Sequence, residues 1–181
     1  MFQLEEIPVP QPSEGEVLIR IQAMGVNPVD LKIRSGEFTR FHPALPAILG
    51  RDASGEISAI GSGVTAFQKG DAVLGMLDYD RGAYAEFVVA SSRELAPKPD
   101  FLSHKQAAAI PVAALTAWQA LFEHGKLLPR QSVLIHGASG GVGHFAVQFA
   151  AAHGALVAAT CRGEDTASWL QHSRSSWSRH L

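Results

Sequence analysis

The chain has 181 residues, 15 basic and 17 acidic side chains, and a formal net charge of −2. This balance lacks the basic cluster that nucleic-acid binding requires, and the single cysteine, Cys161, excludes an intrachain disulfide framework and a multi-cysteine zinc site. No apolar run approaches the roughly 20 residues that span a bilayer, and residues 1–6 do not look like a signal peptide, so we expect a cytoplasmic protein without nucleic-acid or membrane partners.

Short strand-like pieces, separated by Pro and Gly, make up the chain from residue 2 to about residue 100. Residues 17–22, 57–59 and 84–89 alternate with a period of two, which predicts strands. The glycines between the pieces suit turns and barrel corners. One short helix is expected over residues 29–35. Together these features predict a small β-rich barrel or sandwich.

The pattern changes to helices at Leu102. Ser103 followed by Gln106 is a capping-box signature, which predicts the start of a helix. A second helix is expected over residues 112–124, with Gly125 as a left-handed residue that ends it.

A strand, a helix and a second strand follow in the last third of the chain. Residues 132–136 are apolar enough for a buried strand, residues 141–153 form the expected helix, and Gly154 ends it. Residues 155–160 form the next strand. This order predicts one βαβ unit, whose strands pair in parallel.

A glycine-rich segment, GASGGVG at 137–143, connects that first strand to its helix. Such a turn lets phosphate oxygens reach backbone N–H groups at the positive end of the helix dipole. Gly140 would allow the close approach of a pyrophosphate, and Gly143 would let the helix pack tightly on the strand. Ala138 stands where the usual G-x-G-x-x-G motif has its first glycine. A merely structural turn is the alternative, but the position inside a βαβ unit predicts a dinucleotide site formed by Ser139, Gly140, Gly141, Val142 and Gly143.

The end of the second strand indicates which dinucleotide is bound. An acidic residue there would bind the ribose diol of NAD, whereas this chain has Thr160 and Arg162. Arg162 suits a 2′-phosphate, so we add both residues to the predicted cofactor site and favour NADP(H). The alternative for Arg162 is an ordinary solvated arginine.

The remaining candidate residues give weaker evidence of a functional site. The eight histidines form no metal-binding spacing, so no metal site is predicted. Asp30 and Asp52 are expected to orient backbone turns rather than to form an acid–base pair. Residues 167–181 contain five serines and no acidic residue, which predicts a disordered or aberrant tail; a partner-binding tail is the alternative.

Many short motifs occur in a fixed order. They are GVNPVD at 25–30, RSG at 34–36, LGRD at 49–52, GEI at 55–57, GSGV at 61–64, GDAV at 70–73, GAYAE at 82–86, AAAIP at 107–111, LTAW at 115–118 and the glycine segment. In this order they resemble the zinc-independent quinone oxidoreductase (zeta-crystallin-like) branch of the medium-chain dehydrogenase/reductase superfamily, over residues 4–166.

The resemblance implies an α/β fold with a β-rich N-terminal part. A GroES-like barrel over residues 1–115 would be followed by an incomplete Rossmann domain over residues 116–166, with cofactor and substrate in the cleft between them. The implied reaction is NADPH-dependent hydride transfer to a quinone or an activated enone, with Asn27 and Thr116 near the nicotinamide. Phe38 would take the place of an aromatic residue that follows the RSG turn, without a hydroxyl to donate.

The resemblance also implies chemistry without zinc. The zinc-dependent branch has ligands at the positions of Asn27 and Arg51 and near Val112, and none of those ligand types is present here. Relatives begin with one more strand, and a full Rossmann domain has about six parallel strands. The resemblance therefore implies a truncated chain, in which turnover and a homodimer through the Rossmann sheet are open. The alternatives are a non-catalytic nucleotide-binding chain and a GroES-like structural fragment.

Overall fold

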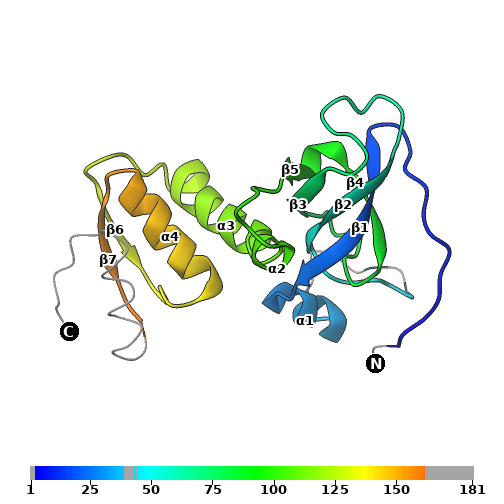
Figure 1. The fold of residues 1–181 in the computed structure, drawn as a ribbon. Coiled ribbons are helices and arrows are strands. Elements are labelled where there is room, and N and C mark those ends of the chain that lie inside the picture. The colour runs from blue at the N-terminus through cyan, green and yellow to red at the C-terminus, as the bar shows by residue number, and fades with distance from the viewer. Residues whose placement is uncertain (1–2, 39–42, 44, 162–181) are drawn as a thin grey trace. The chain divides into compact units, whose positions relative to one another are not determined.

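The computed structural model describes residues 3–38, 43 and 45–161, shown as a ribbon in Figure 1. The chain divides into two compact units, Met1–Val112 and Ala113–Leu181, whereas the sequence analysis places the domain boundary after residue 115. Arg162 and the expected tail over residues 167–181 lie outside the described residues, so both remain predictions.

The first unit is built on one antiparallel sheet of five strands in the order β4-β1-β2-β3-β5 (Figure 1). This sheet confirms the predicted β-rich N-terminal part. The strands are β1 (Glu16–Gly25), β2 (Asp52–Ile60), β3 (Ala72–Met76), β4 (Phe87–Ser91) and β5 (Leu95–Pro97), with a short 3₁₀ helix, η1 (Ser92–Glu94), before β5.

Alternation along β1 places two residues in the core of this unit. Val17 and Ile19 are fully buried, and Arg20 is exposed on the other face. Leu18, which the alternation also assigns to that other face, is only 6% exposed. Both faces of β1 are therefore covered at this end.

The predicted alternation over residues 84–89 is partly wrong, because β4 begins only at Phe87. Upstream of it, the backbone amides of Ala83 and Tyr84 donate 2.9 Å hydrogen bonds to the carbonyls of Gly50 and Leu49. These bonds hold Ala83 and Tyr84 against residues 49–50 rather than in the sheet.

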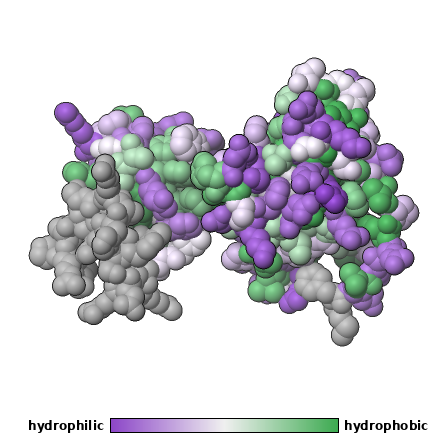
Figure 2. Space-filling view, viewed as in Figure 1, coloured by the Kyte–Doolittle hydropathy of each residue, from purple (hydrophilic) through white to green (hydrophobic). Residues whose placement is uncertain are grey.

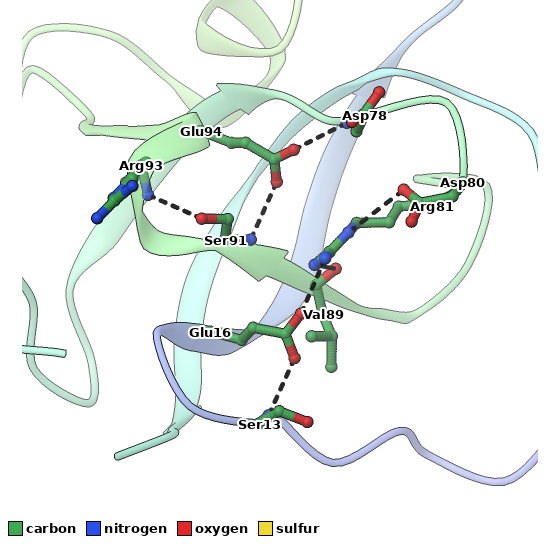
Figure 3. A network of polar contacts seen from close by, with 9 residues as sticks. All are labelled: Ser13, Glu16, Asp78, Asp80, Arg81, Val89, Ser91, Arg93 and Glu94. Carbon is green, nitrogen blue, oxygen red and sulfur yellow. Dashed lines mark hydrogen bonds and ion pairs between the residues drawn. The ribbon is translucent and has the colours of Figure 1, made fainter. Parts of the chain in front are cut away.

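A polar network in the first unit connects the loop between β3 and β4 to the strands β1 and β4 (Figure 3). Arg81 donates from Nη2 to Oε1 of Glu16 at 2.8 Å and from Nη1 to the carbonyl of Val89 at 3.2 Å. Glu16 also accepts a 3.0 Å hydrogen bond from the amide of Ser13. The bonds from Ser13 and Arg81 hold the pKa of Glu16 below its ordinary value. The network therefore ties β1 and β4 to the loop that follows β3.

Local capping signals start and end the helices of the first unit. Helix α1 (Pro28–Ser35) ends at Gly36, whose φ of 79° is left-handed. Helix α2 (His104–Ala107) begins after Ser103, whose hydroxyl accepts from the amide of Gln106 at 3.3 Å. The side chain of Gln106 accepts in return from the amide of Ser103 at 2.9 Å, which confirms the predicted capping box.

The second unit is a βαβ unit preceded by a helix whose first two residues still belong to the first unit. Its elements are α3 (Pro111–Trp118), a π-helix η2 (Gln119–His124) that continues it, β6 (Ser132–Ile135), α4 (Gly141–Ala152) and β7 (Leu156–Ala159). β6 and β7 pair in parallel, as predicted. The buried side chains of Leu121, Ile135, Val147 and Val157 form its core.

The end of the second helix differs from the prediction. Gly125 has a φ of −74°, so it is not the expected left-handed residue. The left-handed residue is its neighbour Lys126, with a φ of 49°. A Cβ at residue 125 would lie 2.7 Å from the carbonyl oxygen of Ala120 and 2.9 Å from that of Leu121. Glycine is needed here because the wide π turn brings two carbonyl groups close to it. Gly154, with a φ of 83°, is left-handed as predicted.

The two strands of the second unit carry apolar side chains on both faces. Ile135 and Val157 are buried, whereas Leu134 and Leu156 are 58% and 55% exposed. In the first unit, hydrophilic and hydrophobic residues intermix over the surface seen in Figure 2. Within the described residues, none of the helices combines the length and the apolar character needed to cross a membrane.

Candidate functional site

The turn between β6 and α4 is held by the end of β7. The amide of Ala138 donates to the carbonyl of Thr160 at 2.8 Å, and the amide of Thr160 donates to the carbonyl of Ile135 at 3.0 Å. The hydroxyl oxygen of Thr160 also accepts from the amide of Gly137 at 3.3 Å. Gly137 has a φ of 68°, which glycine adopts without strain. Thr160 thus fixes the turn from the neighbouring strand.

Gly143 lies in the first turn of α4, where the helix passes close to this loop. A Cβ at residue 143 would collide with the carbonyl oxygen of Gly137 and would lie 2.7 Å from Cα of Ala138. Both neighbours are backbone atoms, so they cannot move aside cheaply. Only glycine lets the helix start this close to the turn.

A cavity of about 340 Å³ opens at the same turn. Its lining includes three of the predicted cofactor residues and is formed by Gly137, Ser139, Gly140, Thr160 and Cys161. The cavity is therefore bounded by the loop after β6 on one side and by the end of β7 on the other.

The start of α4 supplies hydrogen-bond donors at this loop. The first i→i−4 bond of the helix runs from the amide of His144 to the carbonyl of Gly140, at 3.1 Å. The amides of Gly141, Val142 and Gly143 precede it and so have no such partner inside the helix. They carry the positive end of the helix dipole, which favours an anion. These backbone donors and the hydroxyls of Ser139 and Thr160 suit phosphate oxygens, so the residues present fit a dinucleotide.

A second group of polar residues lies in the first unit, around Asn27 at the start of α1. Asn27 donates from Nδ2 to Oδ2 of Asp52 at 2.8 Å, and its amide donates to Oδ2 of Asp30 at 2.8 Å. The other oxygen of Asp52 accepts from the amide of Val112 at 2.7 Å. Because a carboxylate only accepts, Asp52 fixes the NH₂ end of Asn27.

Both carboxyl groups of this cluster are buried, with Asp30 4% and Asp52 2% exposed. Burial raises the pKa of Asp52, against the opposing effect of its hydrogen bonds. Tyr84 donates from its hydroxyl to Asp30 at 2.9 Å, and burial together with that carboxylate raises the pKa of the phenol. Oδ1 of Asp30 has no hydrogen-bond partner among the described residues.

This buried cluster was missed by the sequence analysis, which assigned Asp30 and Asp52 to backbone turns. Asp30 does accept from the amide three residues before it, and that spacing was the available signal. The contact between Asn27 and Asp52 joins residues that are 25 positions apart, so no local pattern indicates it.

The two predicted catalytic residues belong to different units. Asn27 precedes α1 in the first unit, and Thr116 lies on α3 in the second, with its side chain exposed. Their shared role at a nicotinamide stays a prediction.

The three positions where the zinc-dependent branch has ligands show other chemistry here. Asn27 offers an amide bound to Asp52, Arg51 offers a guanidinium, and Val112 has an apolar side chain. None of these is a usual zinc ligand. Within the described part of the chain, no three His, Cys, Asp or Glu side chains gather in a way that could hold a metal ion.

Comparisons with known proteins agree with this architecture. Residues 13–100 match the alcohol dehydrogenase GroES-like domain. The chain is 43% identical over 160 residues to the quinone oxidoreductase of Rattus norvegicus, a match that covers 88% of this chain and 48% of that relative. This chain is a homologue of the quinone oxidoreductases. It is also 41% identical over 163 residues to the chloroplast envelope quinone oxidoreductase homolog of Arabidopsis thaliana, covering 86% of this chain and 50% of the relative.

Solved structures of this family superpose on the chain. An alcohol dehydrogenase superfamily protein from Novosphingobium aromaticivorans has a TM-score of 0.90 and 42% identity, over 95% of this chain and 53% of that one. The quinone oxidoreductase of Escherichia coli, complexed with NADPH, has a TM-score of 0.81 and 32% identity, over 94% of this chain and 52% of that one. The expected family and fold class are confirmed, including the GroES-like domain and the incomplete Rossmann unit. The chain spans about half the length of the relatives it matches, which carry the name quinone oxidoreductase.

Proposed function

We propose that this quinone oxidoreductase homologue binds NADP(H) and serves the transfer of a hydride to a quinone or an activated enone, without zinc. The supporting observation is the cavity of about 340 Å³ at the glycine turn, lined by residues just before α4 and by residues at the end of β7. When bound, the cofactor supplies the hydride. The residues of this chain bind it, orient it and exclude water from it.

Each predicted residue has a distinct part in this proposal. The turn residues Ser139, Gly140, Gly141, Val142 and Gly143 hold the pyrophosphate, and Thr160 fixes the turn. Asn27, whose NH₂ end is fixed by Asp52, is the first predicted contact of the nicotinamide. Thr116 is the second predicted contact of the nicotinamide. The proton that completes reduction of a quinone comes from solvent.

The deciding experiment is a titration of the purified, monodisperse chain with NADPH, followed by tryptophan quenching or calorimetry. We expect saturable binding, and Gly140→Asp should abolish it by placing a carboxylate against the phosphates. Gln148→Glu adds the same charge to an exposed site on α4 and should leave the affinity unchanged. A folded chain that does not bind NADPH, or Gly140→Asp protein that binds as well as the wild type, would reject the site.

Nucleotide preference is tested by Arg162→Glu. If Arg162 contacts the 2′-phosphate, the ratio of affinities for NADPH and NADH should fall by at least about tenfold, the loss expected for a charge-assisted contact. An unchanged ratio removes Arg162 from the site.

Turnover is a separate measurement. Reduction of a quinone by NADPH distinguishes an enzyme from a chain that binds the nucleotide without catalysis. The chain that binds the nucleotide without catalysis is kept as a second candidate. Leu134 on β6 and Leu156 on β7 are exposed, so the described residues leave that face of the two-stranded sheet uncovered. A homodimer and a cytoplasmic location stay predictions.

A further inference from the structure

Thr160 is the first residue after β7, and residues 135–138, at the end of β6 and in the glycine turn, all contact it. Ile135 and Ala159 form the last register pair of the two parallel strands, so the residues that follow them, His136 and Thr160, are neighbours. The backbone of Thr160 donates to the carbonyl of Ile135 at 3.0 Å and accepts from the amide of Ala138 at 2.8 Å. These two bonds fix the backbone of Thr160 and therefore hold its hydroxyl beside the turn.

The hydroxyl of Thr160 has two partners on this segment. The amide of Gly137 donates to Oγ1 at 3.3 Å, and Nδ1 of His136 lies 3.1 Å from the same oxygen. Thr160 also lines the cavity of about 340 Å³ at the turn. A phosphate bound in that cavity would therefore be the third group that meets this hydroxyl.

The contact between His136 and Thr160 can run in two directions. A threonine hydroxyl offers one proton and two lone pairs, and the amide of Gly137 takes one lone pair. When Nδ1 of His136 is bare, it accepts the hydroxyl proton, and Oγ1 is left with a lone pair toward the cavity. When Nδ1 carries a proton, it donates to Oγ1 instead, and the hydroxyl proton is free for a ligand.

Only the second direction suits a phosphate, because phosphate oxygens accept hydrogen bonds and do not donate them. We propose that His136 is a positioning residue of the cofactor site: its Nδ1–H donates to Oγ1 of Thr160 and so turns the Thr160 hydroxyl toward a phosphate oxygen of the dinucleotide. This inference rests on the proposed function, because that function supplies the phosphate. A ligand that binds one form better shifts the protein toward that form, so bound phosphate should favour the proton on Nδ1.

The position of that proton is measured by NMR on the full chain with ¹⁵N-labelled histidine. Two-bond proton–nitrogen correlations distinguish a bare ring nitrogen from a protonated one. His136→Asn identifies the signals of His136 among the eight histidines, because these signals alone disappear. In alkaline buffer a histidine ring is neutral and holds a single proton. We expect NADPH to increase the fraction of His136 rings with that proton on Nδ1, and a bare Nδ1 in the complex overturns the proposal.

Affinity for NADPH tests the same contact by substitution. Thr160→Val removes the hydroxyl and keeps the shape, and it should weaken binding about tenfold, the loss expected for a hydrogen bond to a charged group. His136→Leu should weaken binding several-fold, because the donor that turns the hydroxyl is lost. His136→Asn should keep the affinity within about twofold of the wild type, because its Nδ2–H donates from nearly the position of Nδ1.

A double-mutant cycle separates positioning from a merely structural effect. If His136 acts through the hydroxyl, His136→Leu should change the affinity by less than about twofold once Thr160→Val is present. A loss of the same size in both backgrounds, or no loss in the wild-type background, overturns the proposal. His124→Leu removes an exposed imidazole from the same unit and should leave the affinity unchanged. Circular dichroism verifies that each variant is folded.

The proposed function fails by a different result. Inorganic pyrophosphate has the phosphate oxygens without the nucleosides, and it is the second probe in the NMR and binding experiments. A chain that binds pyrophosphate with a proton on Nδ1, but does not bind NADPH, would reject the function and keep the role of His136. A chain that binds NADPH while Nδ1 stays bare would keep the function and reject that role. A folded chain that binds neither probe rejects both.

Discussion

The side-chain amide of Asn27 and the buried carboxylate of Asp52 form a 2.8 Å hydrogen bond that joins the start of α1 to the first residue of β2. The same carboxylate accepts from the amide of Val112, at the start of α3. One buried acidic group therefore fixes three segments that are far apart in the sequence.

Replacing Asp52 by asparagine should lower the free energy of unfolding and change its pH dependence. The new NH₂ group would face one of the two donors that Asp52 now accepts from, Nδ2 of Asn27 or the amide of Val112. The lost hydrogen bond should lower the free energy of unfolding by about 1–3 kcal/mol. The folded pKa of Asp52 is raised by burial, so the folded state binds its proton more tightly than the unfolded state does. Wild-type stability thus falls as pH rises from the ordinary carboxyl pKa to the raised one, and the variant should lack that contribution.

Urea unfolding at a series of pH values measures this effect, and Asp100→Asn, at an exposed position, controls for the lost charge. If the curves of wild type and Asp52→Asn ran parallel across the acid range, Asp52 would not be the group that titrates.

The contribution of Glu16 to the pH dependence of stability should have the opposite sign to that of Asp52. The folded pKa of Glu16 is lowered, by hydrogen bonds from Ser13 and Arg81, so its stabilisation is present above the unfolded pKa and is lost as pH falls through the folded one. Glu16→Gln should flatten this acid loss. A double-mutant cycle with Arg81→Gln should give a coupling energy of up to about 1 kcal/mol.

The ion pair between Arg20 and Glu56 is the comparison for this cycle. Its side chains are 55% and 42% exposed, against 23% and 21% for Arg81 and Glu16. Solvent screens the more exposed pair, so its coupling energy should be at most about 0.5 kcal/mol. Equal coupling energies would contradict a role of burial in the Glu16–Arg81 pair.

Gly143→Ala should destabilise the second unit. The added Cβ would meet the backbone of Gly137 and Ala138, and relieving that overlap costs about 1–3 kcal/mol. Gly141→Ala is the matched folding control, because nothing lies within 4 Å of a Cβ there and alanine favours a helix. Urea unfolding followed by circular dichroism compares the two. Equal stabilities would disprove the close packing at Gly143.

The end of the π-helix offers a test at neighbouring positions. Lys126→Gly should raise the free energy of unfolding by about 0.5–1 kcal/mol, because it relieves a left-handed conformation in a residue with a side chain. Gly125→Ala should lower it by about 1–3 kcal/mol, because its Cβ would meet the carbonyl oxygens of Ala120 and Leu121. Thermal unfolding of both variants is the measurement. A stabilising Gly125→Ala would mean that the π turn is absent.

Features that depend on near neighbours in the chain were predictable from sequence. The capping box of Ser103 and Gln106 depends on residues three positions apart, and the left-handed Gly154 follows directly from the end of its helix pattern. The βαβ order and the glycine turn were also predictable, since hydrophobic periodicity and a glycine cluster both act over short distances.

The sequence by itself determined the family, the order of the elements and the place of the glycine turn, because each follows from local patterns or from motifs in order. Only the tertiary structure decided which side chains meet: the π turn that changes the role of Gly125, the buried pair of Asn27 and Asp52, and Arg51 on the ring of Tyr79. These contacts join residues on separate elements or depend on how a helix packs. Their formation is set by burial and close packing in three dimensions, which no short stretch of sequence encodes.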